Sequence, residues 1–216
     1  MSASLAGSTA RTRKEELWLG CKSKSCCYSS VVIPTGKDVW RIARTLDLLP
    51  WHFLVYFETA QPRRDAFALD SSPRRFRLAL SKNPRRMAHG AHACTFLLRT
   101  RHGHHRCGLG DLRPAVCKSF PSEMVAGVVC IMSETGCRCR TWTLADVDIE
   151  HEAEAIRERQ ADSEVYCGIV EQWNRGVSEP GRRLDFEGYC EHLLAAYDGL
   201  ARTEAPAGTG PNETPA

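Results

Sequence analysis

The apolar residues in the last third of the chain recur at helical spacing. Thr143 and Asp146 are spaced as in a capping box, and apolar positions follow at intervals of three, four or seven residues as far as Val170. This pattern predicts one long helix over about 144–174. A second helix is expected over about 185–200, where the apolar positions are Phe186, Cys190, Leu193, Tyr197 and Leu200.

Shorter elements are expected nearer the N-terminus. A second capping box, Thr35 with Asp38, precedes a helical pattern and predicts a helix over about 37–47. Pro50 suits the first turn of another helix over about 50–58. Residues 63–84 are rich in arginine and broken by prolines, and the alternation of Phe76, Leu78 and Leu80 there predicts a strand among loops.

The composition is that of a globular protein, since 43% of the 216 residues are hydrophobic and 25% are charged. We expect a disordered N-terminal segment (residues 1–16), a cysteine-rich region (17–142), a helical part of the same domain (143–200) and a disordered tail (201–216). The predicted fold is a single α+β domain, mostly helical, with long cysteine-bearing loops that a metal stabilises and two C-terminal helices that cover one side.

The charge and hydropathy patterns narrow the classes of partner and the location. A formal net charge of +3 does not require a polyanion, so nucleic acid is not expected, and a protein partner is left open. No apolar run reaches the roughly 18 residues of a membrane helix, and the N-terminus lacks the apolar core of a signal peptide. These patterns indicate a cytoplasmic protein. Thiols stay reduced there, and eleven cysteines then favour a metal site over disulfides.

Eight of the cysteines fall into three groups. They are Cys21, Cys26, Cys27, Cys94, Cys107, Cys117, Cys137 and Cys139. Thiolates select zinc, Cu(I) or iron with sulfide, so all eight are candidate metal ligands. Cys26 and Cys27 can share one ion only if the backbone turns there, and otherwise they serve two sites or one of them is structural.

The segment around Cys117 suits the rigid presentation of a ligand. Pro114 and Pro121 fix the backbone on either side of Cys117. Arg113 and Lys118 beside a multi-thiolate centre would offset its negative charge and donate hydrogen bonds to sulfur. For Lys118, a solvated basic face is the alternative.

The spacing of these residues resembles a known family. Cys21-x4-Cys26-Cys27, Cys94-Thr-Phe-Leu, Cys107-Gly-Leu-Gly and Leu112-Arg113-Pro114-x2-Cys117-Lys118-x-Phe120-Pro121 resemble the cysteine-cluster family of zinc- or iron-chelating proteins, called YkgJ-like or CxxCxxCC. The resemblance covers about residues 16–142. It implies an iron–sulfur cluster or zinc, and one branch of the family contains the flagellin lysine methylase. Lys24 departs from the pattern, because it stands where a second cysteine of the first group is expected.

Other cysteines and histidines have simpler interpretations. Cys130, Cys167 and Cys190 lie in apolar patterns and are expected to be small buried hydrophobes. Histidines crowd around Cys94 and Cys107, where zinc ligation is one interpretation and an exposed loop tip is the favoured one. They are His89, His92, His102, His104 and His105. The five tryptophans are expected in the core or at helix starts.

The leading hypothesis is a metal-binding protein with a redox or metal-handling role. Cys27, Cys94, Cys107 and Cys117 are its best four ligands, for zinc or a [4Fe–4S] cluster. No nucleotide-binding, HExxH or radical-enzyme motif is present, so the question of enzyme activity stays open. The alternatives are a protein-modifying, methyltransferase-like enzyme with an accessory cluster, and a zinc-dependent interaction module that presents arginines to an acidic partner. These arginines are Arg63, Arg64, Arg74, Arg75, Arg85 and Arg86.

Overall fold

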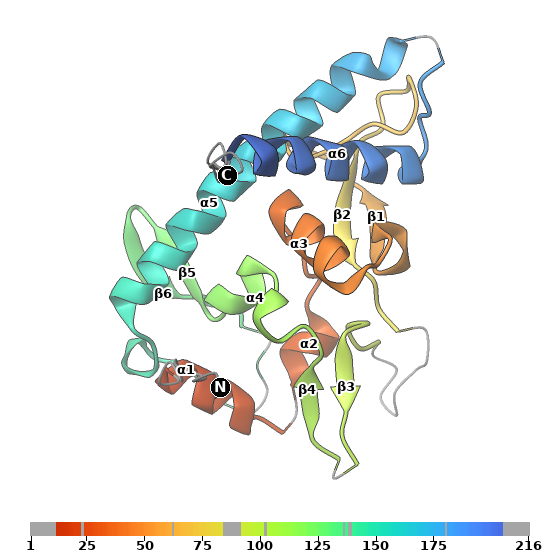
Figure 1. Cartoon of the computed structure of the whole chain (residues 1–216). Coiled ribbons are helices and arrows are strands. Elements are labelled where there is room, and N and C mark those ends of the chain that lie inside the picture. The colour runs from red at the N-terminus through yellow and green to blue at the C-terminus, as the bar shows by residue number, and fades with distance from the viewer. Residues whose placement is uncertain are drawn as a thin grey trace, which may run out of the picture. The chain divides into compact units, whose positions relative to one another are not determined.

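The computed structural model describes most of the chain and has a mixed architecture (Figure 1). The described residues are 12–22, 24–61, 63–83, 92–101, 103–135, 137, 140–179 and 181–204. Their helices and three two-stranded sheets confirm the α+β class. The helices are α1 (Arg13–Gly20), α2 (Ser25–Ser29), α3 (Gly36–Leu46), α4 (Ala115–Ser119), α5 (Ile149–Arg175) and α6 (Phe186–Glu204). The strands are β1 (Leu54–Glu58), β2 (Phe76–Leu80), β3 (Leu97–Arg99), β4 (His105–Cys107), β5 (Ser122–Val125) and β6 (Val128–Ile131).

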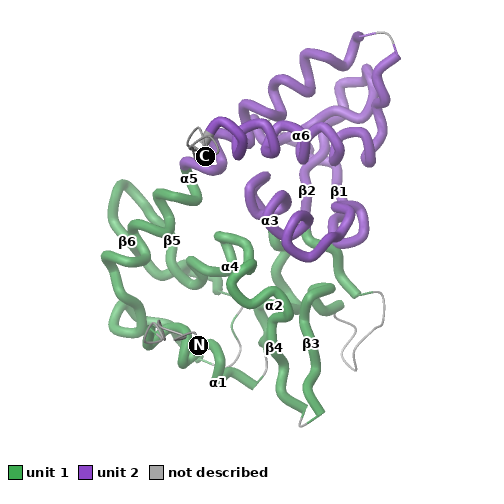
Figure 2. The backbone as a smooth tube through the Cα atoms, viewed as in Figure 1, with its two compact units in different colours: residues 1–32, 80–160 green, residues 33–79, 161–216 purple. Residues whose placement is uncertain are grey.

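The chain divides into two compact units, each made of two separate stretches of sequence (Figure 2). Unit 1 consists of residues 1–32 and 80–160, and unit 2 consists of residues 33–79 and 161–216. The two units therefore interleave along the sequence. The three groups of candidate cysteine ligands all belong to stretches assigned to unit 1.

Unit 2 is built around aromatic side chains. The Phe67 ring stacks on Tyr189 with centroids 3.8 Å apart, and the Tyr189 hydroxyl donates to the Tyr166 hydroxyl at 2.9 Å. The Trp173 indole donates to the carbonyl of Ala68 at 2.7 Å. β1 and β2 form the sheet of this unit. A continuous apolar core of this kind is what an ordinary small domain uses for its stability.

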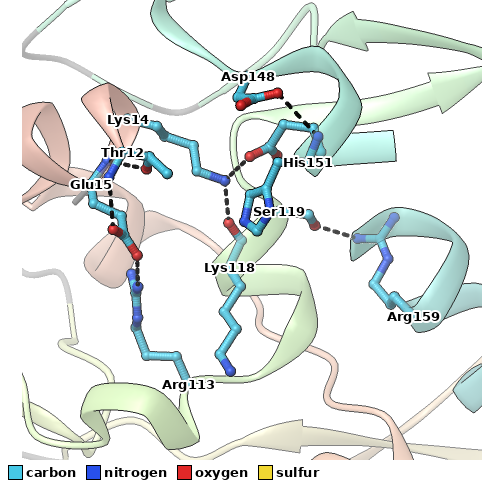
Figure 3. A network of polar contacts seen from close by, with 10 residues as sticks. Thr12, Lys14, Glu15, Arg113, Lys118, Ser119, Asp148, His151 and Arg159 are labelled. Atoms are coloured by element: carbon cyan, nitrogen blue, oxygen red, sulfur yellow. Dashed lines mark hydrogen bonds and ion pairs between the residues drawn. The ribbon is translucent and has the colours of Figure 1, made fainter. Parts of the chain in front are cut away.

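Unit 1 has a more polar interior. Only seven of the 28 buried apolar residues of the described chain belong to it, whereas six of the eight buried polar or charged residues do. Lys14 and Glu152 form a buried ion pair, and Lys14 also donates to the carbonyl of Lys118 at 2.6 Å (Figure 3). Arg159 of α5 donates to the Ser119 hydroxyl at 3.1 Å. Polar contacts thus tie α1, α4 and the start of α5 together.

Several predicted elements are confirmed, with shifts at their ends. Thr35 and Asp38 form the expected capping box at the start of α3. Phe76–Leu80 is a strand, and the two long C-terminal helices are present as α5 and α6. The capping box of Thr143 and Asp146 closes a single 3₁₀ turn, Leu144–Asp146, so that α5 begins only at Ile149.

The helix predicted over 50–58 is wrong. Pro50–His52 is one 3₁₀ turn, and Leu54–Glu58 is strand β1. The sequence Val55-Tyr56-Phe57 is β-branched and aromatic, which suits a pleated strand paired with β2 better than a helix.

The predicted boundaries of the two disordered segments are also wrong. Residues 12–16 belong to the N-cap and first turns of α1, whose capping box is formed by Thr12 and Glu15. α6 continues to Glu204, so the first four residues of the expected tail are helical. In both places a few residues gain helical hydrogen bonds that composition alone does not reveal.

Candidate metal centre

The first cysteine pair lies on the short helix α2. Lys24 precedes this helix in the left-handed conformation, with φ 46° and ψ 35°. Cys26 and Cys27 are both helical, so the backbone is not extended there and both thiols can reach one site. Lys82 holds the other end of α2, because its ammonium donates to the carbonyls of Cys27 at 3.1 Å and Ser30 at 2.7 Å. A cation at a helix C-terminus satisfies carbonyls that have no partner within the helix.

The second and third cysteines flank a hairpin. The amide of Cys94 donates to the carbonyl of Cys27 at 2.9 Å, which joins the two segments directly. β3 begins three residues after Cys94 and pairs antiparallel with β4, whose last residue, Cys107, lies opposite Leu97. The hairpin therefore returns Cys107 toward the level of Cys94.

The fourth cysteine lies on α4, in the predicted rigid frame. Pro114 is the N-cap of this helix, and the amide of Cys117 donates to the Pro114 carbonyl at 2.8 Å. The peptide bond between Phe120 and Pro121 is cis. The carbonyl of Lys118 and the hydroxyl of Ser119 are the groups that Lys14 and Arg159 bind (Figure 3). Both sides of Cys117 are thus fixed by contacts within unit 1.

These segments bring five thiols to one cavity of about 250 Å³. The cysteines in its wall are Cys26, Cys27, Cys94, Cys107 and Cys117. All of the cavity belongs to unit 1. Among the residues that the structure describes, no three His, Cys, Asp or Glu side chains converge closely enough to share a single ion. The thiols stand around a space instead of meeting at one point.

The thiols are close enough to perturb one another. The Cys27 thiol donates to Cys26, which lowers the pKa of Cys26 to about 7 although burial opposes this. The pKa of Cys27 is raised by the same hydrogen bond, by burial, and by the neighbouring Cys26, Cys117 and Cys94. Burial raises the pKa of Cys94, and nearby Cys107 adds to this effect. Cys27 is therefore the member that interacts with most of the others.

Two cations and one indole ring complete the site. The Lys24 side chain is fully buried; its ammonium donates to the carbonyl of Trp18 and lies 4.0 Å from the centroid of the Trp18 ring. The guanidinium of Arg113 lies 4.5 Å from the same ring, and Glu15 pairs with it at 4.0 Å. Burial lowers the pKa of Lys24, while Cys21 opposes the shift. Trp18 and Arg113 both line the cavity.

The remaining predicted ligands do not line this cavity. Cys21 is half-buried and lies near Lys24. Cys137 is also half-buried; its amide donates to the hydroxyl of Thr135, which does line the cavity. Cys139 lies outside the described residues.

The simpler interpretations are confirmed in part. Cys167 and Cys190 are buried in unit 2, as expected. The burial predicted for Cys130 is wrong, because it is only half-buried on β6, where its thiol donates to the carbonyl of Val128 at 3.6 Å. This strand belongs to a two-stranded hairpin, which has too few neighbours to enclose every side chain.

The histidines and arginines have distinct environments. His104 is exposed, as expected for a loop tip, and His105 shares a hydrogen bond of 3.2 Å with the Tyr28 hydroxyl. His89, His102, Arg85 and Arg86 lie outside the described residues. Three of the other arginines form ion pairs with carboxylates of unit 2, and Arg75 donates to the carbonyls of Ser72 and Arg74. The pairs are Arg63 with Asp65, Arg64 with Glu164 and Glu171, and Arg74 with Asp70.

Sequence reasoning missed two residues of the site. The sequence predicts Trp18 only in the core or at a helix start, whereas in the structure it forms part of the cavity wall, three positions before Cys21. Lys82 lies in the segment interpreted as strand and loop, and nothing in its local pattern indicates that it holds α2. The contact between the Lys82 and Cys94 segments appears only in the structure, where the two residues form a β-bridge and the amide of Thr95 donates to the carbonyl of Ser81 at 3.0 Å.

Comparisons with protein-family models, with curated proteins and with solved structures find no match to this chain. The family resemblance therefore stays a prediction. In the part of the chain that the structure describes, every helix is too short or too polar to cross a bilayer.

Proposed function

We propose that unit 1 binds an iron–sulfur cluster and that the protein has a redox or metal-handling role. The observation that carries the proposal is the gathering of thiols from three distant segments, around residues 26, 94–107 and 117, at one cavity. Thiolates are the ligands that clusters and zinc use. Donors arranged around a space suit a cluster of several metal atoms better than a single ion, which needs all its sulfurs about 2.3 Å away.

Cys27, Cys94, Cys107 and Cys117 are the proposed ligands. Cys27 interacts with Cys94 and Cys117, and Cys94 interacts with Cys107, so these four form a connected set. Cys26 is the alternative to Cys27, since both line the cavity and exchange a hydrogen bond. A bound cluster would supply one-electron chemistry, and Lys24 and Arg113 would offset its negative charge.

The scarcity of a core in unit 1 supports a structural need for metal. A unit with few buried apolar residues and several buried polar groups gains little from the hydrophobic effect. Metal binding supplies folding free energy directly, as in small zinc domains, where it amounts to about 10–16 kcal/mol.

The test is anaerobic purification followed by visible spectroscopy and analysis of iron, sulfide and zinc. We expect a coloured protein that contains iron and sulfide. Cys94→Ser and Cys117→Ser should each lose most of the bound iron and sulfide. Cys130→Ser, which removes a half-buried thiol of the same unit, should keep both. Colourless protein with stoichiometric zinc would show that the site holds zinc and not a cluster. Protein without metal, or full metal content in both ligand variants, would refute the proposal.

The enzyme alternative has one observation in its favour. A second cavity of about 310 Å³ shares Trp18, Arg113 and Cys117 with the cysteine cavity, and its wall carries Lys14, His151 and Glu158. Its size is at the lower end for small-molecule sites. Saturable binding of S-adenosylmethionine, lost in a His151→Ala variant, would support a methyltransferase, and absence of binding to the metal-loaded protein would remove this alternative.

A further inference from the structure

Positive charge is segregated in one stretch of the sequence. The 40 residues from Ser71 to Gly110 contain nine of the 29 lysines and arginines and none of the 26 aspartates and glutamates. Within unit 1, the described part of this stretch includes the β3–β4 hairpin. Charge of one sign in a single exposed element produces a local field that the mild net charge conceals.

The arginines of the hairpin are exposed and have no acidic partner among the described residues. Arg99, Arg101 and Arg106 are exposed, and so is the nearby His104. None of them is within ion-pair distance of a carboxylate in the described residues, in contrast with Arg113 and Arg140 of the same unit, which pair with Glu15 and Asp146. The positive charge of the hairpin is therefore available to another molecule.

The hairpin is attached to the cysteine cavity. Cys107 is the last residue of β4, and Cys94 lies just before β3. Two contacts tie strand β4 to the N-terminal part of unit 1: the Tyr28 hydroxyl with His105 at 3.2 Å, and Arg106, which donates to the carbonyl of Leu19 at 2.6 Å. A molecule on the hairpin would lie next to two of the proposed metal ligands.

The exposed surface also carries an apolar residue. Leu98 is 56% exposed and lies opposite Arg106 in the β3–β4 register. An apolar contact surrounded by charges is typical of protein interfaces, where charge guides the encounter and apolar burial holds it. The exposed hairpin residues include no Trp, Tyr or Phe on which bases could stack, so they do not favour single-stranded nucleic acid.

We propose that the β3–β4 hairpin is the docking site for a protein partner with an acidic surface around an apolar contact. The docked partner would lie beside the proposed metal site, so the biological role of this interaction rests on the proposed function. The docking surface consists of Leu98, Arg99, Arg101, His104 and Arg106.

The probe is a fluorescein-labelled peptide of about 20 residues in which glutamates surround leucines. An oligouridylate of equal length represents the alternative class of ligand, single-stranded nucleic acid. We expect peptide binding that weakens as salt rises from about 50 to 200 mM, because exposed charges are screened. Arg99→Glu/Arg101→Glu should weaken it at least about tenfold, equivalent to 1.4 kcal/mol. Leu98→Ser should weaken it without changing the salt dependence.

The matched control is Arg157→Glu/Arg202→Glu, which makes the same charge change at exposed helical positions. Equal weakening in the control would overturn the assignment to the hairpin, and tighter binding of the oligouridylate would overturn the choice of a protein partner. Metal content is measured in every preparation. Unchanged peptide binding in the hairpin variant at full metal content counts against the docking site alone, whereas absent metal counts against the proposed function.

Discussion

Lys24 places a buried cation beside the cysteines of the first group. It occupies the position where the resembling pattern has a cysteine, and its buried ammonium lies among the thiols of the first group. An isolated buried cation is costly in an apolar interior, but it is favourable beside a thiolate centre of negative charge. Its left-handed backbone also sets the direction of α2.

Replacing Lys24 should therefore weaken metal binding. We expect Lys24→Met to reduce metal affinity about 10- to 100-fold, as is usual when a group that supports metal ligands is removed. Lys24→Arg should retain most of the affinity, because it keeps the charge. The control is Lys22→Met, an exposed position two residues away. Competition with a chromogenic chelator measures the affinities; equal values for Lys24→Met and Lys22→Met would exclude this role.

The buried ion pair between Lys14 and Glu152 is a second case in which single residues matter, here for the stability of unit 1. The Glu152 side chain is only 1% exposed. Its Oε1 pairs with Lys14, and its Oε2 has no hydrogen-bond partner in the described residues. Removing one member of a buried pair typically costs about 3–5 kcal/mol. We expect Glu152→Gln to destabilise unit 1 by roughly this amount at neutral pH. Denaturant unfolding measures it, with exposed Glu154→Gln of the same helix as the control, and equal midpoints would contradict the prediction.

Individual elements were predictable where local signals decide them. A capping box and the spacing of apolar positions predict α3, and the spacing of apolar positions alone predicts α6. β1 could not be distinguished from a helix by its spacing, since its partner β2 lies 18 residues further on and the pairing is not local. Cys94, Cys107 and Cys117 were predicted from their sequence frame, whereas the roles of Trp18 and Lys82 depend on contacts between distant segments.

The start of α3 provides a test of packing. A Cβ atom on Gly36 would lie 2.6 Å from the Tyr197 ring and 2.7 Å from the Tyr166 ring. We expect Gly36→Ala to destabilise unit 2 by about 1–3 kcal/mol, because overpacking outweighs the gain in helix propensity. Gly199→Ala, on α6, would bring a Cβ only to 4.0 Å from the flexible end of Arg202 and should instead stabilise by roughly 0.5–1 kcal/mol. Thermal unfolding compares the two, and changes of the same sign would contradict the packing argument.

His192 on α6 should make unit 2 sensitive to pH. Burial lowers its pKa below 6.5, and Arg182 adds to the shift, while a backbone contact to Ile169 opposes it. The unfolded chain then binds a proton first as the pH falls, so stability is complete above about pH 6.5 and decreases until the pH reaches the folded pKa. His192→Gln should flatten this decrease. Unfolding midpoints between pH 7.5 and about 5 measure it, and parallel profiles for the two proteins would exclude His192 as the source.

At the scale of the whole molecule, the two units differ in what stabilises them. Unit 2 has an aromatic core, whereas unit 1 has a cavity lined by thiols and a network of buried polar contacts. The sequence suggested a continuous cysteine-rich region over 17–142, but residues 33–79 within it belong to unit 2. Composition could not reveal this, because the interleaving depends on which segments pack together.

Removal of metal should consequently act on discontinuous stretches of the chain. After anaerobic chelation we expect faster amide hydrogen exchange in residues 24–32 and 92–135, because a metal site contributes folding free energy to the unit that contains it. Residues 36–58 should keep their protection. Mass spectrometry of peptic fragments measures both, with Cys130→Ser treated identically as the control. Uniform loss of protection over all three stretches, 36–58 included, would show that the two units unfold together.

The interleaving of the units also sets an order for biosynthesis. The thiol of Cys27 leaves the ribosome 67 positions ahead of Cys94, directly after that of Cys26. At about 5–20 residues per second, this interval lasts roughly 3–13 s. During that time these two thiols have no partners from the later segments, and residues 33–79, which belong to the other unit, are synthesised first. Insertion of the proposed metal would therefore be a late event in the life of the nascent chain, because it would have to wait until Cys117 has emerged.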